Sequence, residues 1–258
     1  MIVRNDIHEL YRPWRMEEFV SSSFWSPLRR WYLPCKGVGD FLVGLFLLVA
    51  TSPLTLVSAL LVRLTSSGPA FYSQTRIGKN GRLFTIYKLR TMYHNCESTS
   101  GPRWSTPGDA RITPLGRILR RTHLDELPQL WNVVRGDMAL IGPRPERPEF
   151  IPNLAQALHH YTDRLLVRPG MTGLAQVQLP PDTDLASVRR KLAYDLYYVR
   201  YVSLWLDLRI LVGTLLYLLR LNVNLLPRLG LVPPRHVIEE AYQTATGEVV
   251  AVTAVQPA

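Results

Sequence analysis

Uncharged residues are not spread evenly along the chain, and the longest run of them covers residues 41–62. The run contains no Asp, Glu, Lys or Arg. At 1.5 Å per residue it would form a helix about 33 Å long. The hydrocarbon core of a bilayer is roughly 30 Å thick. The pattern therefore predicts that residues 41–62 enter a membrane.

Ser52 and Pro53 lie in the middle of this run. A proline in a helix interior removes a backbone hydrogen bond and bends the helix. A break here would leave two arms of about 14–18 Å, and neither arm could span a bilayer alone. Basic residues flank both ends of the run, so both ends should prefer the cytoplasmic side: Arg29, Arg30, Lys36, Arg63, Arg76, Lys79 and Arg82. We therefore favour a re-entrant helix-break-helix over the alternative, a kinked helix that crosses once.

After this run the pattern changes to short elements. Apolar and aromatic residues in 70–92 indicate two short strands joined by a hairpin turn at 78–81. Residues 113–121 are typical of a short helix, and a second helix is expected to begin near Asp125 and end at Gly136. The middle of the chain is therefore expected to hold a small β-hairpin among helices.

Residues 184–221 indicate a long helical region. Its apolar run at 210–219 is too short to span a membrane, so it is either an amphipathic helix in the membrane interface or a packed core helix. The predicted fold class is mixed α/β and mostly helical. It combines an N-terminal re-entrant membrane helix with a small cytoplasmic catalytic domain that contains the β-hairpin and interfacial amphipathic helices.

Four segments are expected along the chain. They are a basic and aromatic arm at 1–36, the re-entrant membrane helix at 37–64, the catalytic domain at 65–221 and a C-terminal tail at 222–258. The arm is either an interfacial anchor, because Trp, Tyr and basic residues favour the headgroup region, or a disordered tail. The C-terminal tail has no periodicity and is expected to be loose.

The charge balance indicates an anionic partner. Thirty Lys and Arg residues oppose twenty Asp and Glu residues, giving a formal net charge of +10. Arginine greatly outnumbers lysine, which favours bidentate contacts to phosphate over diffuse attraction. The two cysteines, Cys35 and Cys96, do not have the spacing of metal ligands and give no disulfide framework, so a reducing compartment is the default expectation.

The candidate chemistry centres on Asp125 and Glu126. This acidic pair lies between clusters of arginines, namely Arg117, Arg120 and Arg121 before it and Arg144 and Arg147 after it. Guanidinium groups can hold an anionic phosphate ester, and a carboxylate can attack phosphorus or hold a metal ion. At the start of a helix, both the carboxylates and a bound phosphate would be stabilised by the helix dipole. The alternative is an ordinary salt-bridged helix surface.

Six short segments, in this order, also match a known family. They are Gly68-Pro69-x-x-Tyr72-x-Gln74-x-Arg76-x-Gly78, Tyr87-Lys88-Leu89-Arg90-Thr91-Met92, Leu124-Asp125-Glu126-Leu127-Pro128-Gln129, Gly136-Asp137-Met138-x-Leu140-x-Gly142-Pro143-Arg144-Pro145, Arg168-Pro169-Gly170-x-Thr172-Gly173 and Asp195-Leu196-Tyr197-Tyr198-Val199. Between Gly37 and Arg220 the chain resembles the bacterial sugar transferases. These are monotopic phosphoglycosyl transferases, which start glycan assembly on a polyprenyl phosphate carrier.

The resemblance implies an enzyme of the bacterial inner membrane with its catalytic domain on the cytoplasmic face. Such an enzyme transfers a sugar 1-phosphate from a nucleotide diphosphate sugar, with a UDP-sugar as first candidate, to undecaprenyl phosphate. It releases the nucleoside monophosphate in the first membrane step of glycan synthesis, for example of exopolysaccharide, O-antigen, capsule or glycoprotein. The implied partners are the two substrates and the membrane, with no nucleic acid; a homodimer is left open.

The resemblance also assigns roles to residues. Asp125 would be the nucleophile that forms a phosphosugar-aspartyl intermediate, and Glu126 would help to hold Mg²⁺. Phosphate binding is expected of Lys88, Arg90, Arg120 and Arg144, although the spacing of Lys88 and Arg90 alone indicates only surface charges. Asp195 and Asp207 would be supporting acidic residues.

Two other functions would use the same sequence. A metal-dependent hydrolase of lipid diphosphates would use the same residues with water as the final acceptor. A basic scaffold on the membrane surface, or a nucleic-acid binder, would explain the charge and the apolar run but not the acidic pair among arginines.

Overall fold

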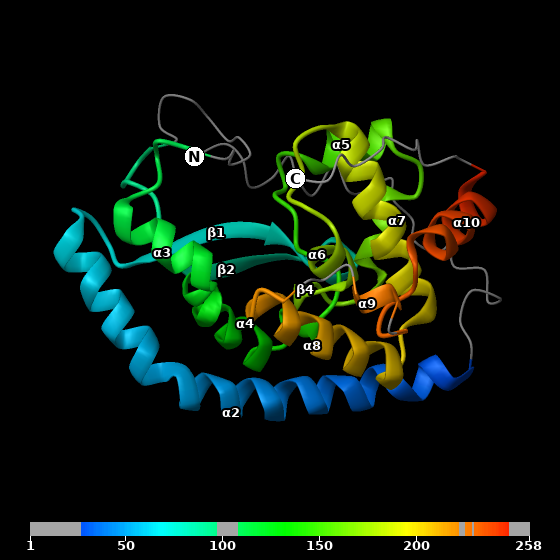
Figure 1. The fold of residues 1–258 in the computed structure, drawn as a ribbon, viewed down its shortest axis with the longest axis horizontal. Coiled ribbons are helices and arrows are strands. Elements are labelled where there is room, and N and C mark those ends of the chain that lie inside the picture. The colour runs from blue at the N-terminus through cyan, green and yellow to red at the C-terminus, as the bar shows by residue number, and fades with distance from the viewer. Residues whose placement is uncertain (1–26, 97–107, 222–224, 229, 248–258) are drawn as a thin grey trace.

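The computed structural model describes residues 27–96, 108–221, 225–228 and 230–247, and its ribbon is drawn in Figure 1. The predicted arm at 1–36 lies mostly outside these residues. The described part of the chain is mostly helical, as the hydrophobic pattern predicts, and it contains two small sheets. One long helix, α2 (Pro27–Thr65), runs along one side of the domain formed by the other elements (Figure 1).

Most of the other helices are short. In chain order they are α3 (Pro114–Thr122), α4 (Leu130–Val134), α5 (Ile151–Ala157), α6 (Leu174–Gln178), α7 (Leu185–Tyr201), α8 (Leu204–Leu218), α9 (Leu225–Arg228) and α10 (Arg235–Thr246). The described residues also include three 3-10 turns: η2 (Lys79–Gly81), which lies between the two strands of the hairpin, η3 (Leu124–Gln129) and η4 (Tyr161–Leu166).

Helix α2 bends but does not break, which corrects the expectation of two separate arms. It is continuous over 39 residues and begins at Pro27 rather than at residue 37. Pro53 has no N–H to donate to the carbonyl of Val49, and the hydroxyl of Ser52 donates to that carbonyl instead, at 2.8 Å. Figure 1 shows the C-terminal part of α2 rising away from the line of its N-terminal part. Ser52 thus satisfies the carbonyl that the proline leaves without a helical partner, and the helix continues through the bend.

The predicted hairpin is confirmed. Strand β1 (Phe71–Ile77) pairs antiparallel with β2 (Leu83–Leu89), and Tyr72 lies opposite Lys88. The turn between them needs a left-handed backbone, since Asn80 has a φ of 57° and the glycine after it a φ of 76°. The hairpin places Lys88 near the end of β2.

A second, parallel sheet was not predicted. Strand β3 (Ala139–Ile141) pairs with β4 (Gly170–Thr172). The chains approach so closely here that a Cβ on Gly170 would lie 2.1 Å from the backbone nitrogen of Gly142. The glycines therefore allow the segment that follows β3 to lie directly against the segment that precedes β4.

The main core lies among α7, α8 and α10. The predicted helical region at 184–221 is two helices: Asp184 caps α7 and Ser203 caps α8, each accepting from a backbone N–H in the first turn. Tyr198 and Ile210 are fully buried between them.

The C-terminal segment corrects a second expectation. Instead of a loose tail, residues 225–247 include α9 and α10, and α10 packs on α7 through the buried Ile238 and Tyr242. Leu226 and Val232 are buried in the same core. Apolar side chains at these positions are too widely spaced to form a recognisable pattern, so only the packed structure identifies them.

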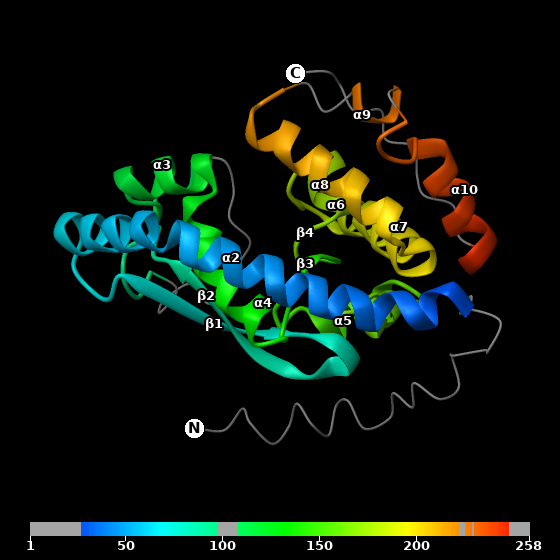
Figure 2. The same ribbon diagram turned by 90° about the horizontal axis from the view of Figure 1, so that it is seen from below.

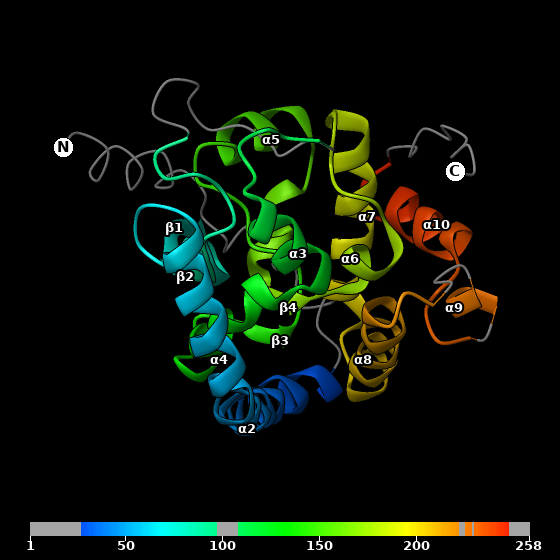
Figure 3. The same cartoon turned by 60° about the vertical axis from the view of Figure 1, so that its left-hand side comes forward.

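Two helices leave large apolar surfaces uncovered. Figures 1 and 3 show α2 and α8 along the same side of the molecule, with α5 on the opposite side. In Figure 2, which views the molecule from below, α2 and α8 run roughly side by side across that face. Phe46 and Leu56 of α2 and Trp205 of α8 are each more than 60% exposed. An uncovered apolar surface of this size indicates contact with another apolar phase.

Candidate functional site

Asp125 and Glu126 lie in η3, directly after α3. The second helix does not begin at Asp125 as predicted, because a 3-10 turn comes first and α4 starts only at Leu130. His123 adopts a left-handed conformation with a φ of 57°, ends α3 and redirects the chain into this turn. Asp125 is buried, with 7% of its surface exposed. The acidic pair is therefore held by a tight turn rather than by the end of a long helix.

Helix α4 fixes this turn between the hairpin and α2. The side-chain amide of Asn132 donates to the carbonyl of Thr85 at 2.7 Å and accepts from the backbone N–H of Tyr87 at 3.3 Å. On its other side α4 packs tightly on α2: a Cβ on Gly44 would lie 2.9 Å from Val133 Cγ1. The position of β2, and with it Lys88, is thus set relative to both η3 and α2.

Glu126 binds two cations at once. Its Oε1 lies 2.6 Å from Lys88 Nζ and 2.5 Å from Arg144 Nη2, and Arg144 Nη1 lies 3.4 Å from Oε2. The side chains are partly open, with exposed fractions of 17% for Glu126, 18% for Lys88 and 35% for Arg144. The structure therefore brings together three of the residues singled out in the sequence, in a centre that a ligand can reach.

The charges of this centre shift its ionisation. Burial alone would raise the pKa of Glu126, but the positive charges of Arg144 and Lys88 hold that pKa well below its ordinary value. Burial raises the pKa of Asp125 above its ordinary value; Lys88 opposes this shift and the charge of Glu126 adds to it. Glu126 is thus a permanently charged partner, whereas Asp125 is a less solvated carboxylate.

Arg120 joins the centre from α3. Its Nε donates to the hydroxyl of Thr91 at 2.8 Å, and its charge lowers the pKa of Asp125. Thr113 caps α3 and accepts from the N–H of Gly116 at 2.9 Å, which fixes the start of the helix that carries Arg120. Arg120 is therefore placed to hold an anion beside Asp125.

Arg90 does not join the centre. Its guanidinium donates to the carbonyls of Ser66 and Ser67, at 2.8 and 2.7 Å, and so caps the C-terminal end of α2. Gly68 has a φ of 106°, and a Cβ there would lie 2.2 Å from Arg90 Nη1. Arg90 is buried, and its contacts tie β2 to the membrane helix rather than to a substrate.

The two other acidic residues lie outside the centre. Asp195 accepts from Arg164 Nε and Nη2 at 3.0 and 2.7 Å, inside the core. Asp207 lies 2.8 Å from Lys36 Nζ and accepts from the hydroxyls of Tyr32 and Tyr198 at 2.5 and 2.8 Å. Both carboxylates therefore stabilise the packing of the fold and do not contact the centre around Glu126. Their basic partners, Arg164 and Lys36, were missed because each is distant in the sequence and no local motif marks the pairing.

Asp125 and Glu126 fit a magnesium ion that a substrate also helps to bind. Within the described part of the chain, no group of three or more His, Cys, Asp or Glu residues could hold a metal ion. Magnesium is commonly held by one or two carboxylates together with substrate phosphates and water. Asp125 and Glu126 could supply the carboxylates, and a diphosphate substrate the remaining ligands. The pair therefore suits a magnesium ion that is shared with substrate.

Comparison with known proteins identifies the family of the chain. The family model described as bacterial sugar transferase matches residues 31–221. The chain is 42% identical over 68% of its length to a UDP-N-acetylgalactosamine-undecaprenyl-phosphate N-acetylgalactosaminephosphotransferase of Aeromonas hydrophila. It is 43% identical over 69% of its length to a UDP-glucose:undecaprenyl-phosphate glucose-1-phosphate transferase of Caulobacter vibrioides. It is also 41% identical over 70% of its length to an exopolysaccharide production protein of Rhizobium leguminosarum.

The matches cover different shares of these relatives: 41% of the Aeromonas protein, 67% of the Caulobacter protein and 94% of the Rhizobium protein. The family match at residues 31–221 includes the hairpin, η3 and the arginine-proline segment after β3. The family match extends over most of the chain and contains Lys88, the acidic pair and Arg144. The chain therefore belongs to the bacterial sugar transferase family.

Proposed function

We propose that this chain transfers a sugar 1-phosphate from a UDP-sugar to undecaprenyl phosphate at the cytoplasmic face of a bacterial membrane. The observation that carries the proposal is the half-open centre in which Lys88 and Arg144 both bind Glu126, directly beside the buried Asp125. Relatives that are named for activities of this kind support the choice of substrates. The product would be the first membrane-bound intermediate of glycan assembly.

In the first step, a carboxylate oxygen of Asp125 attacks the phosphorus that bears the sugar. A P–O bond to that phosphorus forms as the bond to the bridging oxygen breaks, and UMP leaves with the electron pair. Since nucleophile and substrate are both anions, cations must offset their repulsion. Lys88 and Arg144 are placed to exchange Glu126 for the diphosphate oxygens. Arg120 would hold a further phosphate oxygen from the side of α3.

In the second step, an oxygen of undecaprenyl phosphate attacks the same phosphorus. The bond between that phosphorus and the Asp125 oxygen breaks, and the carboxylate is regenerated with its charge. A covalent intermediate means that the two large substrates need not be bound together. Magnesium, held by Glu126 with Asp125 and the substrate phosphates, would supply additional neutralisation of charge.

The membrane contact rests on α2 and α8. Within the described residues, one helix, Trp31–Thr65, is long and apolar enough to cross a membrane. We propose that it enters and leaves on the cytoplasmic side, because the bend at Pro53 and the basic residues at both ends favour re-entry. Exposed apolar residues of α8 would lie in the interface beside it. In this proposed arrangement the lipid phosphate would lie at the level of η3.

The direct test is a release assay with purified protein, undecaprenyl phosphate and a panel of UDP-sugars. We expect one or a few sugars to yield UMP in step with labelled undecaprenyl diphosphosugar. Without the lipid, release should stop at no more than one UMP per enzyme molecule. Continuous formation of sugar phosphate in the absence of lipid would instead show a hydrolase and would contradict the proposal.

A further inference from the structure

The arginine-proline segment after β3 has an unusual set of backbone contacts. Each of the four carbonyls from residue 143 to 146 accepts a hydrogen bond from a different donor, and the donors come from three separate parts of the chain. The pairs are Gly170 N to Pro143 O at 2.9 Å, Arg164 Nη2 to Arg144 O at 2.8 Å, Arg76 Nη1 to Pro145 O at 3.1 Å and Ile77 N to Glu146 O at 3.1 Å. Two of the four donors are side-chain guanidiniums, which form no part of any helix or sheet ladder.

The prolines make these carbonyl contacts important. Pro143 and Pro145 have no N–H, so the segment cannot be held by donating at those positions, although each ring fixes its own φ. Between the prolines stands Arg144, whose side chain reaches Glu126 while its carbonyl is held by Arg164. The backbone at Arg144 is therefore located by an acceptor contact, and the side chain is free to point into the centre.

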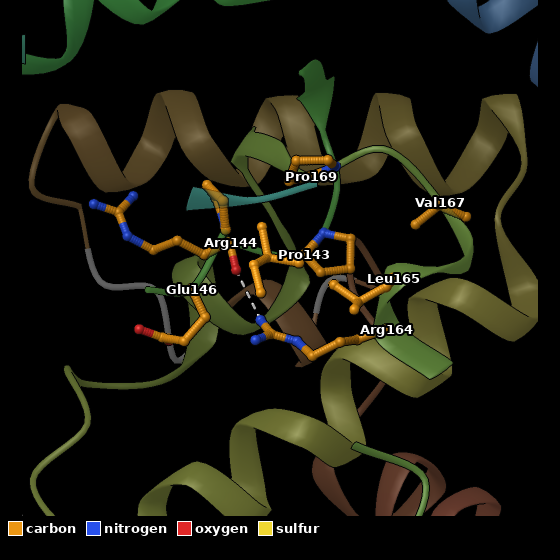
Figure 4. A pocket seen from close by; sticks show the side chains of 9 residues that line it. Pro143, Arg144, Glu146, Arg164, Leu165, Val167 and Pro169 are labelled. Carbon is orange, nitrogen blue, oxygen red and sulfur yellow. Dashed lines mark hydrogen bonds between the residues drawn. The ribbon is translucent and has the colours of Figure 1, made fainter. Parts of the chain in front are cut away.

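Arg164 makes this contact from a buried position in the core. It is 3% exposed, and its Nη2 donates both to Asp195 and to the carbonyl of Arg144. Its Nη1 donates to the hydroxyl of Tyr161 at 2.9 Å. Figure 4 shows Arg164 beneath the segment, with a dashed line to the Arg144 carbonyl and with the Arg144 side chain pointing away from it. Asp195 thus neutralises and orients the Arg164 guanidinium, and Nη2 of the same group also donates to the Arg144 carbonyl.

Arg76, on β1, makes the second side-chain hydrogen bond to this segment. Its Nη1 donates to Pro145 O, its Nη2 donates to Gln74 Oε1 at 2.7 Å, and it lies 3.7 Å from Glu146 Oε1. The contact explains why glutamine and arginine stand two positions apart on this strand: both side chains lie on one face, and the amide orients the guanidinium. The two arginines approach consecutive carbonyls from different elements.

From this geometry we infer that Arg76 and Arg164 are positioning residues for Arg144. They fix the backbone of residues 144 and 145, so that the Arg144 guanidinium is already aimed at the diphosphate when the nucleotide sugar arrives. The inference rests on the proposed function. Loss of either hydrogen bond should weaken the binding of the diphosphate by Arg144, although neither Arg76 nor Arg164 contacts the substrate itself. The reason is that a preorganised Arg144 loses less entropy when the substrate binds.

A double-mutant cycle tests this coupling. We expect Arg76→Gln to lower kcat/KM for UMP release about ten-fold in the otherwise unaltered enzyme, yet less than two-fold when Arg144→Gln is already present. Arg76→Lys keeps the positive charge but lacks the planar guanidinium with its fixed N–H donors, so it should recover only part of the loss. Arg82→Gln, at an exposed arginine of the same hairpin, is the matched control and should leave kcat/KM unchanged. Equal losses in the two backgrounds would overturn the inference.

Arg164→Lys provides the second arm, with thermal unfolding measured in parallel because Arg164 is buried. The same cycle is measured on the affinity for UDP by calorimetry, which needs no turnover. If the unaltered enzyme releases no UMP from any nucleotide sugar, the proposed function fails. A coupled loss of UDP affinity would then still support the positioning role, and independent losses or the absence of UDP binding would refute it.

Discussion

Two groups of charged side chains in this protein use similar components to different ends. In the proposed catalytic centre, Glu126 binds Lys88 and Arg144. In what we call the α2–α8 cluster, comprising Tyr32, Lys36, Asp40, Tyr198 and Asp207, the Asp207 carboxylate binds Lys36 and two tyrosine hydroxyls. Each group therefore contains a carboxylate that binds a lysine and further strong donors at hydrogen-bonding distance.

Exposure distinguishes them. The side chains of Lys36 and Asp207 are 9% and 6% exposed, whereas Arg144 in the catalytic centre is 35% exposed. In the closed cluster every partner is a protein group, and the contacts join α2 to α7 and α8. In the open centre a cation can leave its carboxylate for a phosphate. A buried carboxylate in this fold thus indicates function only where its cations are also accessible to a ligand.

The largest effect that separates the two groups is expected from Glu126→Gln. The change removes the charge that holds Lys88 and Arg144 and that would help to hold magnesium, so UMP release should fall roughly 100-fold or more. The melting temperature should change little, since the site is half-open. Assay of UMP release and thermal unfolding on the same preparation tests this. A large loss of stability with normal activity per folded molecule would place Glu126 with the structural cluster.

Asp207→Asn should show the opposite behaviour. Removing this buried charge leaves Lys36 with Asp40 as its remaining acidic partner, so the free energy of unfolding should fall by about 1–3 kcal/mol. The activity of the molecules that remain folded should stay near that of the unaltered protein. Thermal unfolding in detergent measures the loss.

Lys36→Met combined with Asp207→Asn is the matched control for the closed cluster. It should cost less than the sum of the two single changes, because the two sites are in direct contact and the double variant lacks both charges. Additive costs would show that the ion pair between α2 and α8 contributes nothing to the packing of the membrane helix.

The sequence predicts the catalytic centre better than its surroundings. The acidic pair and the arginines around it are visible because the residues lie in short contiguous motifs. Arg90 belongs to such a motif, yet the structure uses it to cap α2, because a motif records that a residue is required and not which atom it contacts. The buried partners Arg164 and Lys36 have no local signal, since their acidic partners are far along the chain.

The fold follows the same rule. The hairpin and the apolar helix are local patterns, and both are present. The break predicted at Pro53 is a bend, because a neighbouring hydroxyl satisfies the freed carbonyl. The parallel pairing of β3 with β4 and the docking of α10 depend on contacts between distant segments. Periodicity within either segment could not reveal them.

Pro53→Ala tests the proposal that the bend in α2 returns this helix to the cytoplasmic side. Alanine restores the N–H to Val49 and is favoured over proline in a helix interior by about 3 kcal/mol, so α2 should straighten. In a Cys96→Ser background, the exposed Cys35 lies in the N-terminal part of α2, and a cysteine introduced by Lys79→Cys lies in the hairpin turn that follows α2 in the chain. Both should react from the cytoplasmic side in the protein with Pro53, and on opposite sides after the change. Labelling on opposite sides before the change would contradict re-entry.

The smallest effect is expected from Arg120→Gln, in the pH dependence of UMP release. Asp125 must be ionised to attack, and burial raises its pKa, so activity is lost as the pH falls through that raised pKa. Arg120 lowers the pKa of Asp125, so its removal should move the acidic limb of the profile to higher pH. Arg121→Gln, at the exposed neighbour on α3, should move the limb less. A shift to lower pH would show that Arg120 does not act on Asp125.

The central claim is that Asp125 becomes covalently joined to the sugar-bearing phosphorus. Intact-mass spectrometry of the enzyme mixed with its UDP-sugar and no lipid tests it most directly. We predict an added mass of one sugar phosphate, located on the peptide that contains Asp125, absent from Asp125→Asn and removed by undecaprenyl phosphate. The same adduct on another residue, or full turnover by Asp125→Asn, would contradict the account.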